Sequence, residues 1–410
     1  MRALLSTIGS RGDVQPLVAL AHELRALGHD ARFCAPPNFA PWVEAFGFDC
    51  VPIGPDVKQM TSNAPARPVV PSDAQRQALA EHLVRDQFRV VAEAARGCDV
   101  IVAWGALQIA TRSVAETLGL PYVYVTFCPA TLPSPDHAPP RMDRRYPQSL
   151  PGVVNRFLWS RDERSWRARF LDTLNEERAR AGLAPVTSVQ RHVFTDRPWL
   201  AADATLAPAA HNPGMNTVQT GAWMLHDGAA LPAELEHFLM TGEPPILFSF
   251  GSMRGAEHAG QALIDAAHAV GRRAILSQGW SNLGASAAAR DVISIGDVDF
   301  ARLLPRVAVV VHHGGAGTTT AAARAGTAQV IVPHLYDQFY WARRVTRVRV
   351  GATGPTRARL TARALVPALR EALRRDTATH ARELASRISS DGAQIAARRL
   401  AAELAETARR

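Results

Sequence analysis

Short apolar runs alternate with stretches of helical apolar spacing along the first part of the chain. Residues 2–8 are apolar and end at Gly9, residues 14–27 carry apolar side chains at helical spacing, and residues 31–35 form a second apolar run. Alternation of strand, helix and strand predicts a parallel sheet with crossover helices. The same pattern predicts a strand at 99–103, a helix at 107–118 and a strand at 121–126.

The alternation pauses in the middle of the chain and then restarts. A long helix is expected over residues 155–182, a strand-like run follows at 198–206, and the pattern is lost over 208–220. A second α/β unit is expected after that point. Its expected strands are 245–250, 273–277, 292–295, 307–311 and 328–332, and its expected helices are 259–271 and 316–325.

These patterns predict an α/β fold of two Rossmann-like domains that face each other, each with a parallel sheet. The 410 residues suit two domains of roughly 200 residues each. The expected division is an N-terminal domain over 1–207, a linker over 208–220, a C-terminal domain over 221–388 and a last helix over 389–410.

Two stretches rich in proline interrupt the first half, at residues 54–73 and 129–152. Long loops in a compact domain are usually functional or disordered. Both would follow the carboxyl ends of parallel strands, where α/β sheets bind ligands. We expect substrate-binding loops there, with plain connecting loops as the alternative.

Composition narrows the classes of protein that fit. The chain is 47% hydrophobic and 20% charged, which excludes a wholly disordered protein. Its net charge of +9 comes from scattered arginines, with Lys58 the only lysine. Because the arginines lack interleaved aromatic residues, we expect no nucleic-acid partner; a modest positive field also suits an anionic small substrate.

The cysteines and the apolar runs indicate where in the cell the protein is expected. Cys34, Cys50, Cys98 and Cys128 form no CxxC motif, so reduced thiols in a cytoplasmic protein are expected. No stretch approaches 18 uninterrupted apolar residues, so no membrane span is expected. The first residues lack the long apolar segment of a signal peptide.

The strongest local motif is HHGGAGTTT, residues 312–320, which follows an apolar strand and opens a helix. Glycines allow close backbone approach, and the first turn of a helix presents unpaired N–H groups at its positive end. This combination predicts a phosphate cradle, with His313, Thr318 and Thr319 as added donors. The alternative is a glycine-rich turn with buried histidines. No lysine follows, so the motif is not a P-loop.

Two further loops lie at expected carboxyl ends of strands in the same half. Gly251 and Ser252 follow the strand at 245–250 and suggest a second side of a diphosphate site. Asp337 and Gln338 follow the strand at 328–332 and suit hydrogen bonds to sugar hydroxyls. The alternative for Asp337 is that it caps the following helix.

Asp13 lies in the loop after the first strand, beside Ser10, Arg11 and Gly12. It has two interpretations: an N-cap of the following helix, or a general base at the cleft.

The segment Asp297-Val298-Asp299 has the DxD form of some metal-dependent glycosyltransferases. A three-residue match is common by chance, so we expect no metal site there.

The motifs, taken in order, resemble family-1 glycosyltransferases of the GT-B fold, especially bacterial natural-product enzymes of the vancomycin group. The resemblance spans essentially the whole chain. It rests on LLSTIGSRGDVQPLVALAHELRALGH, PSPDHAPP, VQTGAWML, FGSM, HHGGAGTTTAAARAG and DQFYWARRV.

The resemblance implies a deep cleft between an N-terminal acceptor domain and a C-terminal nucleotide-sugar domain, with the last helix crossing back to the first domain. It also implies inversion at the anomeric carbon, no metal and no cofactor. The donor-binding residues that it implies are Ser252, Val298, His313, Gly315, Ala316, Gly317, Thr318, Asp337 and Gln338. Asp13 matches the favoured catalytic base, with Ser10, Arg11 and Gly12 as its supporting loop.

Two departures from the family pattern bear on the donor. Plant relatives place a ribose-binding glutamate eight residues after the phosphate histidine, where this chain has Ala321. A site without that carboxylate suits deoxyribose, which favours a TDP-sugar over a UDP-sugar. Phe339 follows the Asp-Gln pair where vancomycin-type enzymes tend to have proline.

The sequence therefore predicts a glycosyltransferase, a monomer or homodimer, that moves a sugar to a hydroxyl of an apolar natural-product acceptor. The alternatives are a UDP-sugar-dependent sterol or lipid glycosyltransferase, a nucleotide-sugar 2-epimerase and a non-catalytic activator subunit.

Overall fold

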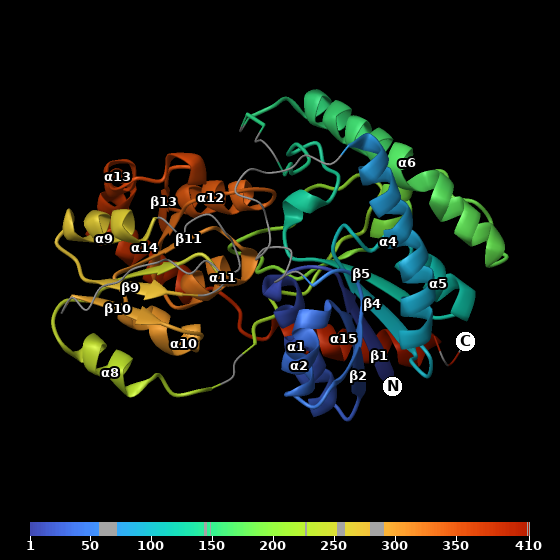
Figure 1. The fold of residues 1–410 in the computed structure, drawn as a ribbon, viewed down its shortest axis with the longest axis horizontal. Helices are drawn as coiled ribbons and strands as arrows, with labels where there is room; N and C mark the ends of the chain where they lie inside the picture. Colours follow the sequence, from blue (N-terminus) through green and yellow to red (C-terminus); the bar gives the residue numbers. More distant parts are fainter. Residues whose placement is uncertain are drawn as a thin grey trace.

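The protein consists of two parallel β-sheets with helices packed around each (Figure 1). The computed structural model describes residues 1–56, 72–142, 146–147, 149–225, 228–251, 259–278, 291–407 and 409. The expected α/β class and the two Rossmann-like sheets are confirmed.

The first sheet has seven strands in the order β3-β2-β1-β4-β5-β6-β7, all parallel. Its strands are β1 (Arg2–Thr7), β2 (Asp30–Ala35), β3 (Asp49–Pro52), β4 (Val100–Trp104), β5 (Tyr122–Thr126), β6 (Trp199–Leu200) and β7 (Val218–Gln219). Its helices are α1 (Arg11–Ala26), α2 (Ala40–Glu44), α4 (Asp73–Ala94), α5 (Thr111–Leu118), α6 (Gly152–Arg180) and α7 (Val189–Phe194).

The second sheet has six parallel strands in the order β10-β9-β8-β11-β12-β13. Its strands are β8 (Ile246–Ser249), β9 (Ala274–Ser277), β10 (Val292–Ile295), β11 (Val309–His312), β12 (Ala328–Ile331) and β13 (Gly351–Thr353). The helices of this part are α8 (Ala233–Met240), α9 (Gly260–His268), α10 (Phe300–Leu303), α11 (Ala316–Arg324), α12 (Gln338–Arg347), α13 (Ala362–Ala372) and α14 (Arg375–Ala385). One more helix, α15 (Gly392–Thr407), follows them in the chain.

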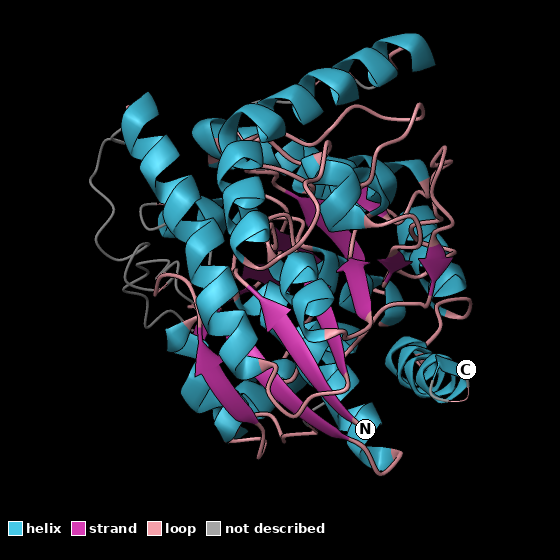
Figure 2. Cartoon of the chain, turned by 90° about the vertical axis from the view of Figure 1, so that its right-hand side faces the viewer, coloured by secondary structure: helices cyan, strands magenta, loops and turns pink. Residues whose placement is uncertain are grey.

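Helices flank the strands, as Figure 2 shows for the first sheet. This explains why the strands are apolar without alternation, since a parallel sheet is buried on both faces. Along β11 every residue is buried, including His312 at its end. Continuous apolar runs therefore predicted the central strands of both sheets, whereas the outer strands β3, β7 and β13 were not predicted.

Several elements differ from the sequence-based expectation, and α2, β3, α7, α8 and β13 were not predicted. The helix expected from residue 14 begins at Arg11, because Ser10 adopts the extended N-cap conformation. The run at 198–206 is a strand only at β6, and the end of the expected linker forms β7, which pairs with β6. Helix α4 was not predicted, although the capping box of Ser72 and Gln75 marks its start.

The last helix, α15, returns to the first domain and packs against α1. Its buried residues Ala393, Ala396, Ala397 and Leu400 belong to the same apolar core as β1 and α1. The chain reaches this position by passing Gly392 over Gly221 and Ala222, where an added Cβ would lie 2.5 Å from the Ala222 carbonyl oxygen. The C-terminal residues thus complete the N-terminal core.

Truncating Leu400 tests that role. Leu400 is 1% exposed, so Leu400→Ala should lower the free energy of unfolding by about 2–5 kcal/mol. Ile395, on the same helix, is 44% exposed, and Ile395→Ala is the matched control with an expected change within about 0.5 kcal/mol. Denaturant unfolding followed by circular dichroism measures both; equal effects would mean that α15 is not part of this core.

Candidate functional site

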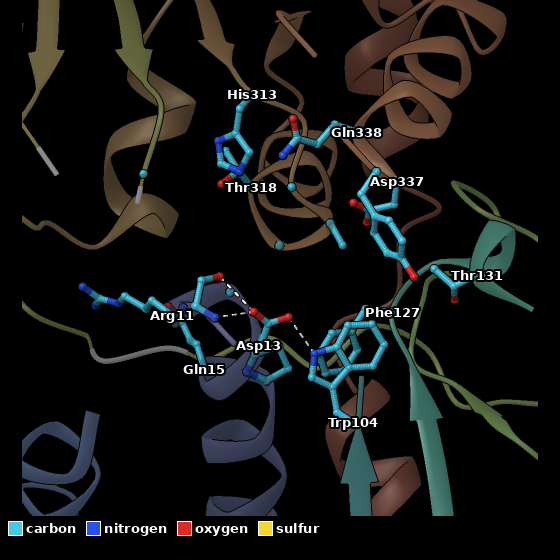
Figure 3. A pocket seen from close by; sticks show the side chains of 18 of the residues that line it. Arg11, Asp13, Gln15, Trp104, Phe127, Thr131, His313, Thr318, Asp337 and Gln338 are labelled. Carbon is cyan, nitrogen blue, oxygen red and sulfur yellow. Dashed lines mark hydrogen bonds between the residues drawn. The ribbon is translucent and has the colours of Figure 1, made fainter. Parts of the chain in front are cut away.

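A cavity of about 1530 Å³ lies between the two halves and is lined by residues of both. Its walls come mainly from loops at the carboxyl ends of strands in each sheet, where parallel α/β sheets bind ligands. Asp13 and Trp104 belong to the first half, and His313 and Asp337 to the second (Figure 3). Loops distant in sequence therefore share one site.

Asp13 lies at the start of α1 with its carboxylate in the cavity. Its Oδ2 accepts hydrogen bonds from the Ser10 backbone N–H (2.5 Å) and the Ser10 hydroxyl (2.9 Å), and its Oδ1 accepts one from Trp104 Nε1 (2.7 Å). The interpretation of Asp13 as the N-cap is wrong, because Ser10 is the N-cap and Asp13 sits three residues later. Asp13 supports the helix start and also faces the cavity.

Packing holds the Asp13 carboxyl in place. A Cβ on Gly9 would lie 2.2 Å from Asp13 Oδ2, so only glycine fits beside the carboxylate. Trp104, which donates to it, packs against Phe127 with ring centroids 4.1 Å apart and the ring planes tilted by 31°. Burial raises the pKa of Asp13, and the hydrogen bonds from Trp104 and Ser10 oppose that rise. A desolvated carboxylate of this kind is a stronger base than one on the surface.

The His-Gly-Gly turn connects β11 to α11 on the opposite side of the cavity. His312 is fully buried and structural. Its Nδ1 accepts from the Gly314 backbone N–H (3.2 Å), so its Nε2 carries the proton and donates to Gln329 Oε1 (3.0 Å). Gly314 has φ +95°, and an added Cβ there would lie 2.6 Å from Ile331 Cγ2. The turn therefore requires glycine at this position.

His313 follows His312 and lines the cavity, as do Gly315, Ala316, Gly317 and Thr318. Among the described residues, none is a hydrogen-bond partner of His313 Nδ1. Burial lowers the pKa of His313 to about 4, so the neutral imidazole presents one N–H donor near pH 7. The arrangement fits the expected phosphate cradle at a helix N-terminus.

Thr319 was expected to add a donor to this cradle, and the structure contradicts that. Its hydroxyl donates to the Gly315 carbonyl oxygen (2.8 Å), and the residue is fully buried. The helical turn directs its side chain back along α11 instead of into the cavity.

Asp337 and Gln338 both line the cavity at the start of α12. Gln338 Oε1 accepts from the backbone N–H groups of His334 (2.7 Å) and Leu335 (3.1 Å), which fixes the loop before the pair. Asp337 occupies the N-cap position but makes no capping hydrogen bond; its Oδ2 accepts from Trp341 Nε1 (3.2 Å). Burial, and to a lesser degree the charge of Asp13, raise the pKa of Asp337 to about 7.

The loop after β10 forms another wall of the cavity, and Val298 lines it together with Ala321 of α11. Asp297 forms an ion pair with Arg11 of the first half, and Asp299 accepts from the Ala301 backbone N–H (2.8 Å) as the N-cap of α10. Both carboxylates of the DxD segment thus have protein partners.

The remaining predicted site residues divide into those that line the cavity and those outside the described residues. Ser10, Arg11 and Gly12 line the cavity as the supporting loop. Ser252 and most of the loop at 54–73 lie outside the described residues; the preceding Gly251 is described and lines the cavity.

The loop at 129–152 contributes to the cavity through its described residues, with one face of α6 beside it. The face of α6 was not predicted as part of the site, because only the packing of that helix shows which side turns inward. The lining residues of this region are Thr131, Pro139, Pro140, Arg141, Met142, Tyr146, Leu158, Trp159, Arg161, Asp162, Ser165, Trp166, Arg169 and Phe170.

The described residues hold no group of three or more His, Cys, Asp or Glu side chains suited to a metal ion. In the same part of the chain, no helix is both long and apolar enough to span a membrane.

Comparison with known proteins identifies the family. Residues 3–134 match the glycosyltransferase family 28 N-terminal domain, and residues 262–407 match the erythromycin biosynthesis protein CIII-like C-terminal domain. Glycosyltransferase GtfE of Amycolatopsis orientalis is 42% identical over 410 residues, which cover 99% of this chain and 98% of that protein. The chain belongs to the GT-B glycosyltransferases of the vancomycin group.

Two more relatives from the same organism support this assignment. The vancomycin aglycone glucosyltransferase is 42% identical and matches 98% of this chain and 97% of its own length. The dTDP-epi-vancosaminyltransferase is 37% identical and matches 86% of this chain and 85% of its own length. This glycosyltransferase is thus similar over nearly its whole length to enzymes of antibiotic biosynthesis.

Solved structures show the same GT-B fold. The kitacinnamycin glycosyltransferase aligns with a TM-score of 0.71 at 18% identity, over 97% of this chain and 98% of that one. The glycosyltransferase VinC, solved in complex with dTDP, aligns with a TM-score of 0.66 at 19% identity over the full length of both chains.

The raised pKa of the buried Asp337 carboxyl predicts that the stability of this glycosyltransferase depends on pH. Because its pKa is about 7 in the folded protein and lies near 4 in an unfolded chain, the folded state binds the extra proton between these values. The contribution of Asp337 to the free energy of unfolding should therefore fall as pH rises from about 4 to about 7. Asp337→Asn, which removes the charge, should raise the Tm more at pH 8 than at pH 5.

Differential scanning fluorimetry at both pH values measures this difference. The expected gain at pH 8 over pH 5 is at least about 1 kcal/mol, or roughly 2–4 °C for a domain of this size. Asp376→Asn is the control, because the Asp376 side chain is 78% exposed and has no buried charge to relieve. A gain for Asp337→Asn that is the same at both pH values would show that Asp337 is ionised throughout.

Proposed function

We propose that the protein is an inverting glycosyltransferase that moves a sugar from a TDP-sugar to a hydroxyl of a natural-product aglycone, with Asp13 as general base. One observation carries the proposal. A desolvated carboxylate from the first half and a helix N-terminus with a neutral histidine from the second half face the same cavity (Figure 3). These are the groups needed to take a proton from one substrate and to bind a diphosphate on the other.

The proposed step begins with a proton transfer. The acceptor O–H gives its proton to the Asp13 carboxylate while the acceptor oxygen attacks the anomeric carbon of the donor sugar. The bond between that carbon and the diphosphate oxygen breaks, and TDP leaves from the opposite face. Attack opposite the leaving group inverts the configuration at the anomeric carbon.

The leaving diphosphate would be stabilised by the second half. Its negative charge increases as the bond breaks, and the N-terminus of α11 with the His313 N–H supplies donors directed at it. We propose that Asp337, which lines the same cavity, accepts hydrogen bonds from sugar hydroxyls when ionised. We propose that no metal is needed, since fixed donors of the protein take that part.

The proposed preference for TDP rests on the residue expected near the ribose of the nucleotide. Ala321 lines the cavity and offers no carboxylate to a ribose 2′-hydroxyl. The name of the dTDP-epi-vancosaminyltransferase and the dTDP complex of VinC support the same nucleotide.

The proposed acceptor is a large aromatic or otherwise apolar aglycone. Aromatic rings line much of the first half of the cavity, namely Trp42, Phe46, Trp104, Phe127, Tyr146, Trp159, Trp166, Phe170 and Phe194. Such rings bury large apolar areas, while their few polar atoms orient a ligand. The name of the vancomycin aglycone glucosyltransferase is consistent with this class.

Replacing the base tests the mechanism. Asp13→Asn should lower turnover at least ~100-fold, because the amide cannot take the acceptor's proton. TDP affinity should stay within about twofold, since Asp13 lies on the half opposite the phosphate cradle. Single-turnover transfer from TDP-glucose and calorimetric titration with TDP measure the two effects.

Ser72→Ala is the matched control for Asp13→Asn. It removes a capping hydrogen bond at the start of α4, outside the cavity lining, and should cost about 1 kcal/mol of stability without a change in turnover. A loss of TDP binding in Asp13→Asn equal to its loss of turnover would instead assign Asp13 a purely structural role.

A titration with TDP and UDP in EDTA tests the donor assignment. A ligand that binds only the folded state adds about 2.7 kcal/mol of stability at 100 times its Kd. TDP should raise the Tm clearly more than UDP does at equal concentration. Stabilisation by UDP that matches or exceeds that of TDP would contradict the preference drawn from Ala321.

A further inference from the structure

Tyr336, the residue before Asp337, has a backbone that side chains rarely adopt. Its φ is +54°, in the left-handed region that favours glycine, and the described residues hold only two other non-glycine examples, Thr195 and Arg349. A bulky residue persists in such a conformation when its surroundings hold it there, and these sites cluster where ligands bind. The position of Tyr336 therefore calls for a functional explanation.

Two sets of hydrogen bonds hold this loop. On one side, the Gln338 amide oxygen binds the backbone N–H groups of His334 and Leu335. On the other, the Tyr336 backbone N–H donates to the carbonyl oxygen of Arg141 (3.0 Å), which belongs to the loop at 129–152 of the first half. Tyr336 thus ties the proposed sugar-binding loop to the proposed acceptor-binding loop.

Tyr336 lines both the large cavity and an adjoining recess of about 40 Å³. Burial raises the pKa of Tyr336, and the nearby carboxyls of Asp337, Asp162 and Asp13 add to that rise; the buried Cys128 thiol also lies near the phenol. The phenol therefore keeps its proton and is a hydrogen-bond donor. Among the described residues no group accepts a hydrogen bond from it.

The neighbours of the phenol indicate which substrate it meets. Cys128 and Asp162 belong to the first half, whose aromatic lining suits the acceptor. Asp337, the next residue, is the one that we propose binds the donor sugar. The Tyr336 side chain thus belongs to the second half but lies beside the part of the cavity that suits the acceptor.

We propose that Tyr336 determines acceptor specificity: its hydroxyl donates a hydrogen bond to a second oxygen of the aglycone, near the hydroxyl that receives the sugar. This proposal rests on the proposed function. The favoured acceptors are therefore aryl compounds with neighbouring oxygens, such as catechols or aryl ethers, over simple phenols.

Three variants and a pair of acceptors test the proposal. Tyr336→Phe removes the hydroxyl alone, and Tyr336→Gly removes the ring while suiting the positive φ. Tyr122→Phe is the matched control, because the buried Tyr122 hydroxyl in β5 has no partner among the described residues and lies outside the cavity lining. The acceptors are a catechol and the phenol that lacks its second oxygen, with vancomycin aglycone as a large reference compound and TDP-glucose as donor.

Tyr336→Phe should raise the acceptor KM about three- to tenfold for the catechol, as expected for one lost hydrogen bond, and leave the KM for the simple phenol unchanged. The Kd for TDP should stay within about twofold. Tyr122→Phe should change neither constant. Unchanged KM values for every acceptor, or a TDP Kd that rises with the acceptor KM, would overturn the proposal.

Tyr336→Gly separates specificity from backbone conformation. If the loop shape alone mattered, glycine would preserve the acceptor KM and raise the Tm. We expect an acceptor KM at least about tenfold higher with no loss of Tm. Wild-type binding of TDP and sugar transfer report on the proposed function separately: if both hold and the Tyr336 variants behave as wild type, only the role of Tyr336 fails, and if neither holds, the two proposals fail together.

Discussion

Parallel strand direction is the constraint on which the site depends. In both sheets every strand runs the same way, so the loops at the carboxyl ends of each sheet gather at one edge, and those two edges face one cavity. Asp13 follows β1, the turn with His313 follows β11, and Asp337 follows β12. These residues are far apart in sequence, and the shared topology brings them together without direct contacts between them.

The two halves also interact through charge. The carboxyls of Asp13 and Asp337 come from opposite halves, yet each is desolvated, and the charge of Asp13 raises the pKa of Asp337. A protein with an apolar residue in place of a buried carboxyl is often more stable. Buried carboxyls of this kind are therefore typical of functional sites. The stability given up at these positions is offset by the strand cores, in which nearly every side chain is apolar and buried.

Local pattern was enough to predict much of the fold and part of the site. Buried parallel strands are continuous apolar runs, so β1, β8 and β11 could be predicted from their apolar runs alone. Motifs near the ends of those strands led to Asp13, His313 and Asp337. What could not be predicted depends on distant partners: Trp104 donates to Asp13 from 91 residues away, and the strain at Tyr336 exists only because Arg141 and Gln338 hold its loop. The prediction that the Thr319 hydroxyl faces the cavity was wrong, because this hydroxyl donates to the Gly315 carbonyl oxygen within α11.

The return of α15 has a consequence for biosynthesis. The core that begins with β1 includes side chains from the last twenty residues of the chain. Domains fold largely as units while a protein is made from its N-terminus. Here the first domain emerges from the ribosome first, yet it lacks part of its own interior until α15 has been synthesised. Its core therefore closes only after the residues of the second domain have been synthesised.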